Sequence, residues 1–342
     1  MTKEETNKTY HGHNIDIMKT FPDNCIDCII TSPPYYQLRD YKTEHQVWNG
    51  DEKCKHEFEK QFCIKCNAWK GELGQEPTYQ MYIDNLISVF AECKRILKND
   101  GTMFVNLGDT YNSVSGGMRD GNFGIKASSG IKNETLIQTK QSLKPKSLLN
   151  IPSRFRIAMT DILGLIQRNN IIWYKPNSMP QSVKDRFTVD FEDIMFFVKS
   201  KNYYFEQQFE KSIDPSRIKG RVFYKPKMLK EDAKHCSQAG NYKNGEYKTR
   251  LKKYPNKNMR AVWAINTAGT SHNHYAAYPE TLIARMIKAG CRENGIVLDP
   301  FGGSGITGKT AMKLNRKYIN IEINKKYIEL SKRINISEHL NF

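Results

Sequence analysis

The stretch Ile296-Val-Leu-Asp-Pro-Phe-Gly-Gly-Ser-Gly305 decides the fold that this sequence predicts. Its first residues form an apolar run typical of a buried strand, and the glycines predict a tight turn. Residues 306–314 then have helical spacing, and residues 318–322 predict a second strand that ends in the acid Glu322. Glycines in such a unit let the backbone approach a ligand, and the acid accepts hydrogen bonds from ribose hydroxyls. The unit therefore predicts a site for a nucleoside-bearing cofactor.

A rival pattern overlaps the same residues. Gly303-Ser-Gly-Ile-Thr-Gly-Lys-Thr310 also fits the phosphate-binding loop G-x-x-x-x-G-K-[ST], which would indicate a nucleotide-dependent DNA-binding protein such as an ATPase or helicase. Asp299 argues against it, because a carboxylate just ahead of the glycines repels a phosphate and suits a cationic ligand. S-adenosylmethionine carries a sulfonium and an ammonium group, so we favour this methyl donor as the cofactor.

A second candidate site lies near the other end of the chain, at Thr31-Ser-Pro-Pro-Tyr35. The apolar run ahead of it predicts a buried strand, which the two prolines end because neither can donate to a ladder. The turn offers the hydroxyl of Ser32, backbone carbonyls and the aromatic face of Tyr35. These groups suit a flat ring that carries an amino group, since oxygens accept from its hydrogens and Tyr35 stacks on the ring. A proline-terminated strand without a chemical role is the alternative.

Three cysteines and one histidine are clustered within thirteen positions: Cys54, His56, Cys63 and Cys66. This ligand set, closed by a Cys-x-x-Cys, suits a tetrahedral structural zinc ion. The Cys-x-His half is tighter than the usual spacing, so unliganded thiols are the alternative. Because nothing nearby indicates an open coordination position, we expect the ion to pin a surface insertion at residues 51–70 and not to take part in catalysis.

The remaining segments predict alternating helices and strands. Helical spacing covers residues 16–21, 77–98 and 152–167, and the second of these is the clearest helix. Buried strands are expected at residues 26–30, 101–107, 171–174 and 193–198. Residues 112–143 have little periodicity and predict a flexible loop. This alternation indicates an α/β fold with a mostly parallel sheet.

The chain is strongly basic, with a formal net charge of +17. Residues 206–260 hold fifteen Lys or Arg against six Asp or Glu, with aromatic residues interleaved among them. Since cations contact phosphates and rings meet bases, we interpret this segment as a nucleic-acid-reading one, with a disordered basic insert as the alternative. No apolar run approaches the ~20 residues of a membrane span, and the N-terminus lacks the apolar core of a signal peptide. We expect a cytoplasmic protein.

Taken together, the motifs at 31–35 and 299–305 resemble those of the beta-class DNA amino-methyltransferases, in which the catalytic half precedes the cofactor half. Residues 107–109, 171–177 and 278–283 fit further blocks of that family, so the resemblance covers most of the chain. It implies a Rossmann-like methyltransferase fold with a doubly wound, mostly parallel sheet, circularly permuted. The fold would carry a zinc-knuckle-like insertion and a small basic target-recognition segment.

The resemblance also implies three parts of the chain and the residues of two sites. Residues 1–205 would form the catalytic half, 206–260 the target-recognition segment and 261–342 the cofactor half. The implied catalytic residues are Ser32, Pro33, Pro34 and Tyr35. The implied residues for S-adenosylmethionine are His13, Asp16, Thr31, Tyr278, Pro279, Asp299, Pro300, Phe301, Gly302, Gly303, Ser304, Gly305 and Glu322.

The sequence departs from the family pattern in two places. Family members commonly have Gly-Asp where this chain has Gly12-His13. Contact with the adenine of the donor therefore falls either to His13, as a hydrogen-bond partner, or to Asp16. The usual His-Glu ahead of the Phe-Phe strand is Phe191-Glu192 here, so no histidine role is carried over.

The implied activity is site-specific methylation of the exocyclic amino group of a base flipped out of double-stranded DNA. Serine in the first position of the turn is more typical of enzymes that act on cytosine N4, and aspartate of those that act on adenine N6. Cytosine N4 is therefore favoured, with adenine N6 as the alternative. No membrane partner is expected, whereas a cognate restriction enzyme and the choice between monomer and homodimer are left open.

Overall fold

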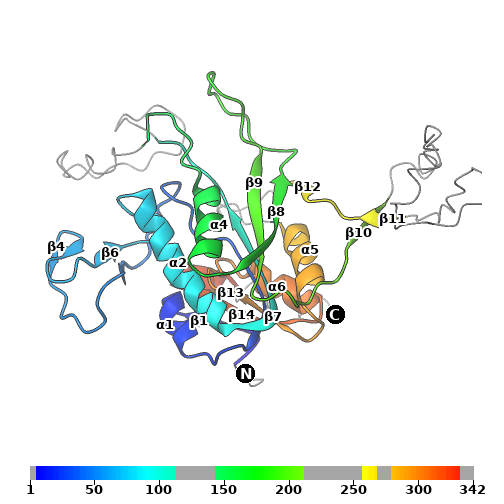
Figure 1. Cartoon of the computed structure of the whole chain (residues 1–342), viewed down its shortest axis with the longest axis horizontal. Coiled ribbons are helices and arrows are strands. Elements are labelled where there is room, and N and C mark those ends of the chain that lie inside the picture. The colour runs from blue at the N-terminus through cyan, green and yellow to red at the C-terminus, as the bar shows by residue number, and fades with distance from the viewer. Residues whose placement is uncertain (1–4, 113–142, 212–255, 268–278, 332–342) are drawn as a thin grey trace, which may run out of the picture. The chain divides into compact units, whose positions relative to one another are not determined.

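A computed structural model describes residues 5–112, 143–211, 256–267 and 279–331 (Figure 1). The chain divides into two compact units, residues 1–206 with 260–342 and residues 207–259. In the second unit, β10 (Phe209–Lys211) pairs antiparallel with β11 (Asn256–Asn258). Nearly all of the loop predicted at 112–143 (residues 113–142), most of the basic segment and Tyr278 lie outside the described residues. No described helix is long and apolar enough to cross a membrane.

An eight-stranded sheet forms the centre of the first unit, in the order β1-β14-β13-β2-β7-β9-β8-β12. Its strands are β1 (Lys8–His11), β2 (Ile26–Thr31), β7 (Leu97–Leu107), β8 (Ile166–Tyr174), β9 (Phe191–Val198), β12 (Val262–Ala264), β13 (Ile296–Asp299) and β14 (Lys317–Glu322). Neighbouring strands are parallel except where β9 pairs with β7 and β8. The predicted α/β fold with a mostly parallel sheet is confirmed.

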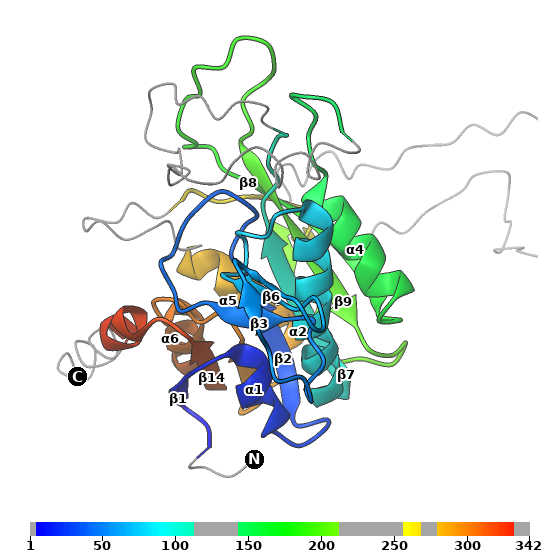
Figure 2. The same ribbon diagram turned by 90° about the vertical axis from the view of Figure 1, so that its left-hand side faces the viewer.

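Helices cover both faces of this sheet. On one face lie α1 (Asn14–Lys19), α2 (Tyr79–Ile96) and α4 (Ile151–Asp161), and on the other lie α5 (Glu280–Gly290) and α6 (Ile306–Lys313) (Figures 1 and 2). The strand β2 is therefore buried along its whole length, which explains the apolar run Cys28-Ile29-Ile30 within it. In α2, the Thr78 side chain accepts a hydrogen bond from Met81 N and caps the first turn.

One predicted helix is shorter than its sequence pattern indicates. The prediction covers residues 152–167, but α4 ends at Asp161 and β8 begins at Ile166. Gly164 lies between them with φ of 62°, a left-handed conformation that favours glycine and turns the chain. Ile162 and Ile166 match the helical spacing, yet both are exposed, so the apolar pattern there does not mark a buried helix face.

The cysteine-rich insertion forms a small sheet of its own within the first unit. Its strands are β3 (Gln46–Trp48), β4 (Phe58–Glu59), β5 (Phe62–Cys63) and β6 (Trp69–Gly71), in the order β3-β6-β5-β4. All their pairings are antiparallel. Trp48 and Trp69 belong to the main hydrophobic core, with 3% and 1% of their surface exposed, so they fix the insertion to the rest of the unit.

Candidate active site

The two turns that the sequence singled out lie at the same edge of the sheet. Strands β2 and β13 are parallel neighbours, with Cys28 opposite Val297. Their carboxyl ends therefore meet, which is where ligands bind in open α/β sheets. The Thr31 hydroxyl at the end of β2 donates a 2.7 Å hydrogen bond to the Asp299 carboxylate at the end of β13, and both residues are buried. This contact joins the two turns directly.

A cavity of about 1520 Å³ opens over this edge. Most of the residues predicted for the two sites line it: His13, Ser32, Pro33, Pro34, Tyr35, Pro279, Asp299, Pro300, Phe301, Gly302, Gly303, Ser304 and Glu322. Three others, Asp16, Thr31 and Gly305, are described but do not line it. The volume exceeds the ~300–1,000 Å³ of an ordinary small-molecule site, so two ligand groups have room there.

The Asp299 carboxylate organises the glycine-rich turn. One oxygen accepts from the hydroxyl of Thr31 at 2.7 Å and from the backbone N–H of Phe301 at 3.0 Å. The other accepts from the hydroxyl of Thr307, in α6, at 2.6 Å. Hydrogen bonds to a carboxylate stabilise its charged form. A carboxylate at the start of the turn suits a cation and disfavours a phosphate.

A second carboxylate, that of Glu322, holds the turn from the next strand. It accepts from Gly303 N and from Asn324 N, both at 2.7 Å. Burial raises the pKa of Glu322, and these hydrogen bonds oppose that rise. Gly305 is the N-cap residue of α6, with φ of 83°, and a Cβ atom there would lie 2.8 Å from Ser331 Cβ. Only glycine fits both the backbone conformation and the space, so the sharp turn depends on it.

The structure distinguishes the two residues considered for contact with adenine. His13 lines the cavity and packs edge-on against Trp48, with ring centroids 5.0 Å apart. Burial lowers the pKa of His13, although Asp16, 3.6 Å away, opposes this shift. In the described part of the chain, no hydrogen-bond partner reaches His13 Nε2. Asp16 itself has 75% of its side chain exposed and lies outside the cavity.

The Ser-Pro-Pro-Tyr turn is held from two sides. Tyr82 donates a 2.7 Å hydrogen bond to the Pro34 carbonyl. Among the described residues, none donates to the Pro33 carbonyl, which stays available to a ligand. The Tyr35 ring packs on Gly108, where a Cβ atom would lie 2.6 Å from Tyr35 Cε2. The glycine at 108 therefore lets the aromatic ring reach its position beside Ser32.

Polar residues to which the sequence reasoning gave no role surround this turn. The Tyr35 hydroxyl lies 2.7 Å from Glu192 Oε2, 3.2 Å from Asn106 Oδ1 and 3.3 Å from Ser32 Oγ. The other carboxylate oxygen of Glu192 pairs with Lys175. Burial, and then the charge of Glu192, raise the pKa of Tyr35 well above its usual value, so the phenol keeps its proton. The sequence could have indicated them by their positions, since these polar residues lie at or near the ends of apolar strands.

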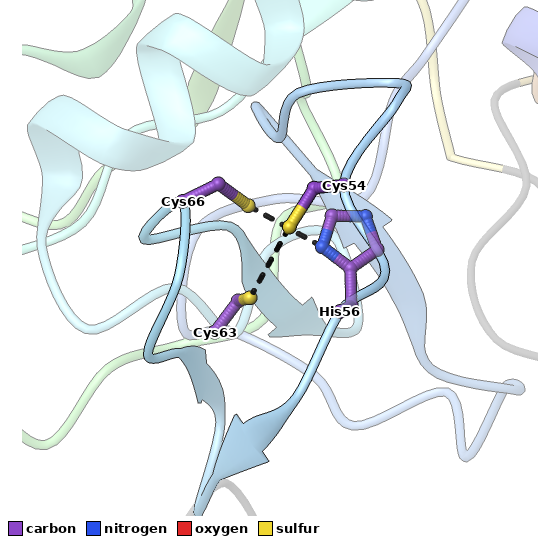
Figure 3. Close-up of side chains that lie close together, drawn as sticks. All are labelled: Cys54, His56, Cys63 and Cys66. Carbon is purple, nitrogen blue, oxygen red and sulfur yellow. Dashed lines mark hydrogen bonds between the residues drawn. The ribbon is translucent and has the colours of Figure 1, made fainter.

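The four predicted metal ligands come together in the insertion, and their ligand atoms all lie within 4.8 Å of one another (Figure 3). Cys54 Sγ is 3.9 Å from Cys63 Sγ, and Cys66 Sγ is 3.3 Å from His56 Nδ1. Tetrahedral bonds of about 2.3 Å to sulfur and 2.0 Å to nitrogen would separate two sulfurs by about 3.8 Å and a sulfur and a nitrogen by about 3.5 Å. The observed spacings fit a zinc ion.

The protonation of these thiols also fits such a cluster. Burial and hydrogen bonds with Cys66 and Cys63 raise the pKa of Cys54 to about 12. Burial also raises the pKa of Cys63, but hydrogen bonds from the backbone and from His56 lower it to about 5. Neighbouring thiols cannot all ionise without a cation between them. A divalent ion would remove that conflict.

Three relatives of this chain are methyltransferases by name. The Type II methyltransferase M.SmaI of Serratia marcescens is 34% identical to this chain over 90% of it and 82% of the relative. M.XycI of Xanthomonas campestris pv. cyanopsidis, also a Type II methyltransferase, is 30% identical over 94% and 85%. The DNA adenine methyltransferase YhdJ of Escherichia coli (strain K12) is 26% identical over 98% and 85%.

Two solved structures share the fold. The PvuII DNA methyltransferase (cytosine-N4-specific) superposes with a TM-score of 0.55 at 18% identity, over 95% of this chain and 84% of that one. TTHA0409 of Thermus thermophilus, complexed with S-adenosyl-L-methionine, superposes with a TM-score of 0.52 at 17% identity, over 95% and 91%. Residues 26–333 match the family model of the DNA methylases named N6_N4_Mtase, and this chain belongs to that family.

Proposed function

We propose that this DNA methylase transfers a methyl group from S-adenosylmethionine to the N4 amino group of a cytosine flipped out of double-stranded DNA. The observation that carries the proposal is the hydrogen bond between Thr31 and Asp299, which puts the Ser-Pro-Pro-Tyr turn and the glycine-rich turn in one cavity. A methyl donor on one turn and an amino group on the other would lie next to each other there. Such positioning contributes on the order of 7–11 kcal/mol to barrier lowering.

The donor site is supported by charge and by hydrogen-bonding capacity. Asp299 supplies the negative charge that a sulfonium and an ammonium group require, and Glu322 supplies oxygens for ribose hydroxyls. His13 offers a neutral ring whose Nε2 has no partner among the described residues, which suits contact with adenine. These features argue against the phosphate-loop alternative, and so does membership of a methylase family.

The base site is supported by the acceptors of the Ser-Pro-Pro-Tyr turn. An amino group has two hydrogens, and Ser32 Oγ and the Pro33 carbonyl can accept them, drawing the nitrogen lone pair toward the donor. The Tyr35 ring, which also lines the cavity, provides a face for the extruded base. Extrusion is required because the amino group is otherwise paired inside the duplex.

The choice of cytosine N4 depends on serine in the first position of the turn. The structural neighbour from PvuII is cytosine-N4-specific by its name, whereas the relative YhdJ is a DNA adenine methyltransferase. Adenine N6 is therefore the second candidate. Nucleoside mass spectrometry of plasmid DNA after incubation with protein and donor tests both. N4-methylcytosine is the expected product, N6-methyladenine would reassign the base, and unmodified DNA would overturn the proposed activity.

Two further assignments belong to this proposal. The cluster at residues 54–66 holds a structural zinc ion that fixes the insertion and takes no part in methyl transfer, as its ligand spacing supports. The basic segment 206–260, most of which forms the second compact unit, contacts the DNA phosphates and reads the target, as its charge and aromatic content support.

A further inference from the structure

A continuous line of polar side chains runs from the Ser-Pro-Pro-Tyr turn to the strand β9. Ser32 Oγ is 3.3 Å from Tyr35 Oη, which is 2.7 Å from Glu192 Oε2, and Glu192 pairs through its other oxygen with Lys175. All four residues line the cavity. The Lys175 and Glu192 side chains are only 18% and 17% exposed, so this ion pair is shielded from bulk water and keeps a defined geometry.

The Glu192 carboxylate fixes the direction of each hydrogen bond in this line. A carboxylate can only accept, so the Tyr35 hydroxyl donates its single proton to Glu192. The Tyr35 oxygen must then accept from the hydroxyl of Ser32. Ser32 consequently faces the cavity with lone pairs and without a proton. Asn106 Oδ1, 3.2 Å from Tyr35, is a longer and uncharged alternative acceptor and would leave the direction unchanged.

We infer that Glu192 is a positioning residue which, through Tyr35, makes Ser32 an obligate acceptor for the target amino group and then a route for the proton that this group loses. The inference rests on the proposed function and adds a proton path to it. Lys175 balances the charge of Glu192 before the substrate binds. A serine without this line could equally turn its own proton toward the amino nitrogen and occupy the lone pair that must attack.

The atoms of the step balance as follows. The nitrogen lone pair forms the new N–CH₃ bond while the S–CH₃ bond breaks and leaves its electron pair on sulfur. In the same step, as the amino nitrogen gains positive charge, it gives one N–H proton to Ser32 Oγ. Ser32 passes its own proton to Tyr35 Oη, and Tyr35 passes its proton to Glu192 Oε2. Both hydroxyls end with one proton each, Glu192 ends neutral, and Lys175 remains an ammonium ion throughout.

The test is single-turnover methyl transfer to a duplex that the wild-type protein modifies, using Tyr35→Phe, Glu192→Gln and Ser32→Ala. Tyr35→Phe keeps the ring and removes the link, so we expect a rate on the order of 10²-fold lower, as for other losses of general acid–base catalysis. Donor and DNA dissociation constants should change less than about twofold, because no binding contact is removed. Tyr35→Phe added to Ser32→Ala should cause no further loss, because the line is already broken.

A solvent deuterium isotope effect gives a readout that a merely structural role would not move. Proton movement along the line predicts an isotope effect for the wild type that shrinks toward one in Tyr35→Phe and Glu192→Gln. Glu72→Gln is the matched control, since Glu72 is a buried carboxylate of the same cavity that accepts from the backbone of Tyr41 and Thr43 instead. It should keep the wild-type isotope effect.

The outcomes separate this inference from the function on which it rests. Additive losses in the double variant, or an unchanged isotope effect in Tyr35→Phe, would overturn the proton line while wild-type methylation still stood. Absence of methyl transfer by the wild type would overturn both. Thermal melting checks that each variant is folded, and if Glu192→Gln unfolds, Tyr35→Phe carries the test because it only deletes one hydroxyl.

Discussion

The Thr31 hydroxyl donates a 2.7 Å hydrogen bond to the Asp299 carboxylate, although the two residues are 268 positions apart in the sequence. It joins the carboxyl ends of two neighbouring parallel strands, so the base-binding turn and the donor-binding turn share one anchor. Since Asp299 also accepts from Phe301 N and from the hydroxyl of Thr307, one side chain determines the shape of the donor turn. The first prediction concerns this carboxylate.

Asp299→Asn should weaken the binding of S-adenosylmethionine by about 10- to 100-fold, because hydrogen bonds to charged groups contribute about 1.5–3 kcal/mol. In addition, the NH₂ group of the asparagine would face an N–H or O–H group that now donates to Asp299. Isothermal titration calorimetry with S-adenosylmethionine measures this. Thr31→Val, which removes only the bridging bond at nearly constant shape, should weaken donor binding less. A dissociation constant unchanged in Asp299→Asn would refute the role given to its charge.

Ser32→Ala should lower the single-turnover rate on the order of 10²-fold and leave the donor dissociation constant within about twofold of wild type. The hydroxyl faces the base and not the donor, so its loss affects the reaction and not donor binding. Rapid-quench assays and calorimetry on the same preparation give both values. Equal losses in rate and in donor affinity would count against the assigned role.

Removal of the metal should unfold the insertion and spare the donor site. We expect about one zinc ion per chain by elemental analysis, a lower melting temperature after chelation, and an almost unchanged donor dissociation constant. Cys63→Ser should lose the ion, whereas Cys25→Ser is the matched control because Cys25 lies outside the cluster. A metal-free protein with an unchanged melting profile would remove the zinc site.

The free energy of unfolding should depend on pH through Glu76, whose side chain is fully buried. Burial raises the pKa of Glu76 from 4.5 to about 7, in spite of hydrogen bonds from Asn85 and from the backbone of Gly74. The folded state therefore binds this proton more tightly than the unfolded chain does. The resulting stabilisation, roughly 3 kcal/mol at most, is present below pH 4.5 and is lost as the pH rises through about 7.

Denaturant titrations between pH 4.5 and 8 check this dependence. Glu76→Gln cannot titrate, so its free energy of unfolding should fall less steeply with pH than that of the wild type, whatever its absolute stability. Asp84→Asn is the control, because Asp84 is an exposed acid of α2. Parallel pH curves for wild type and Glu76→Gln would contradict the prediction.

Local sequence patterns were sufficient to predict most helices and strands and the Cys/His ligand cluster. The apolar run ahead of Thr31, the glycine-rich turn and the Cys/His spacing each carry their information within a few residues, and the predicted strands and ligand cluster are found in the structure. The end of α4 was mispredicted because Ile166, which lies beyond the turn at Gly164, still fits the helical spacing from Ile162. Periodicity reports spacing and cannot report which face is buried.

The polar line from Ser32 to Lys175 could not be predicted in this way. Its members come from the turn after β2, from β9 and from the end of β8, and they meet only because β9 runs antiparallel between β7 and β8. Two apolar strands separated by a loop do not reveal their relative direction. Glu192 was noted in the sequence only as the neighbour of Phe191, which departs from the family pattern, and its partner depends on strand pairing.

The pairing of β1 with β14 brings the first and the last strands of the described fold together at one border of the sheet. Because the two strands are parallel, the start of β1 lies beside the start of β14, where Asn7 N donates to Tyr318 O. The end of β14 lies at the opposite edge of the sheet, where Gly12 N donates to Glu322 O. A linker from the end of β14 back to the start of β1 would therefore have to run along the full length of the strands, as crossover connections in parallel sheets do.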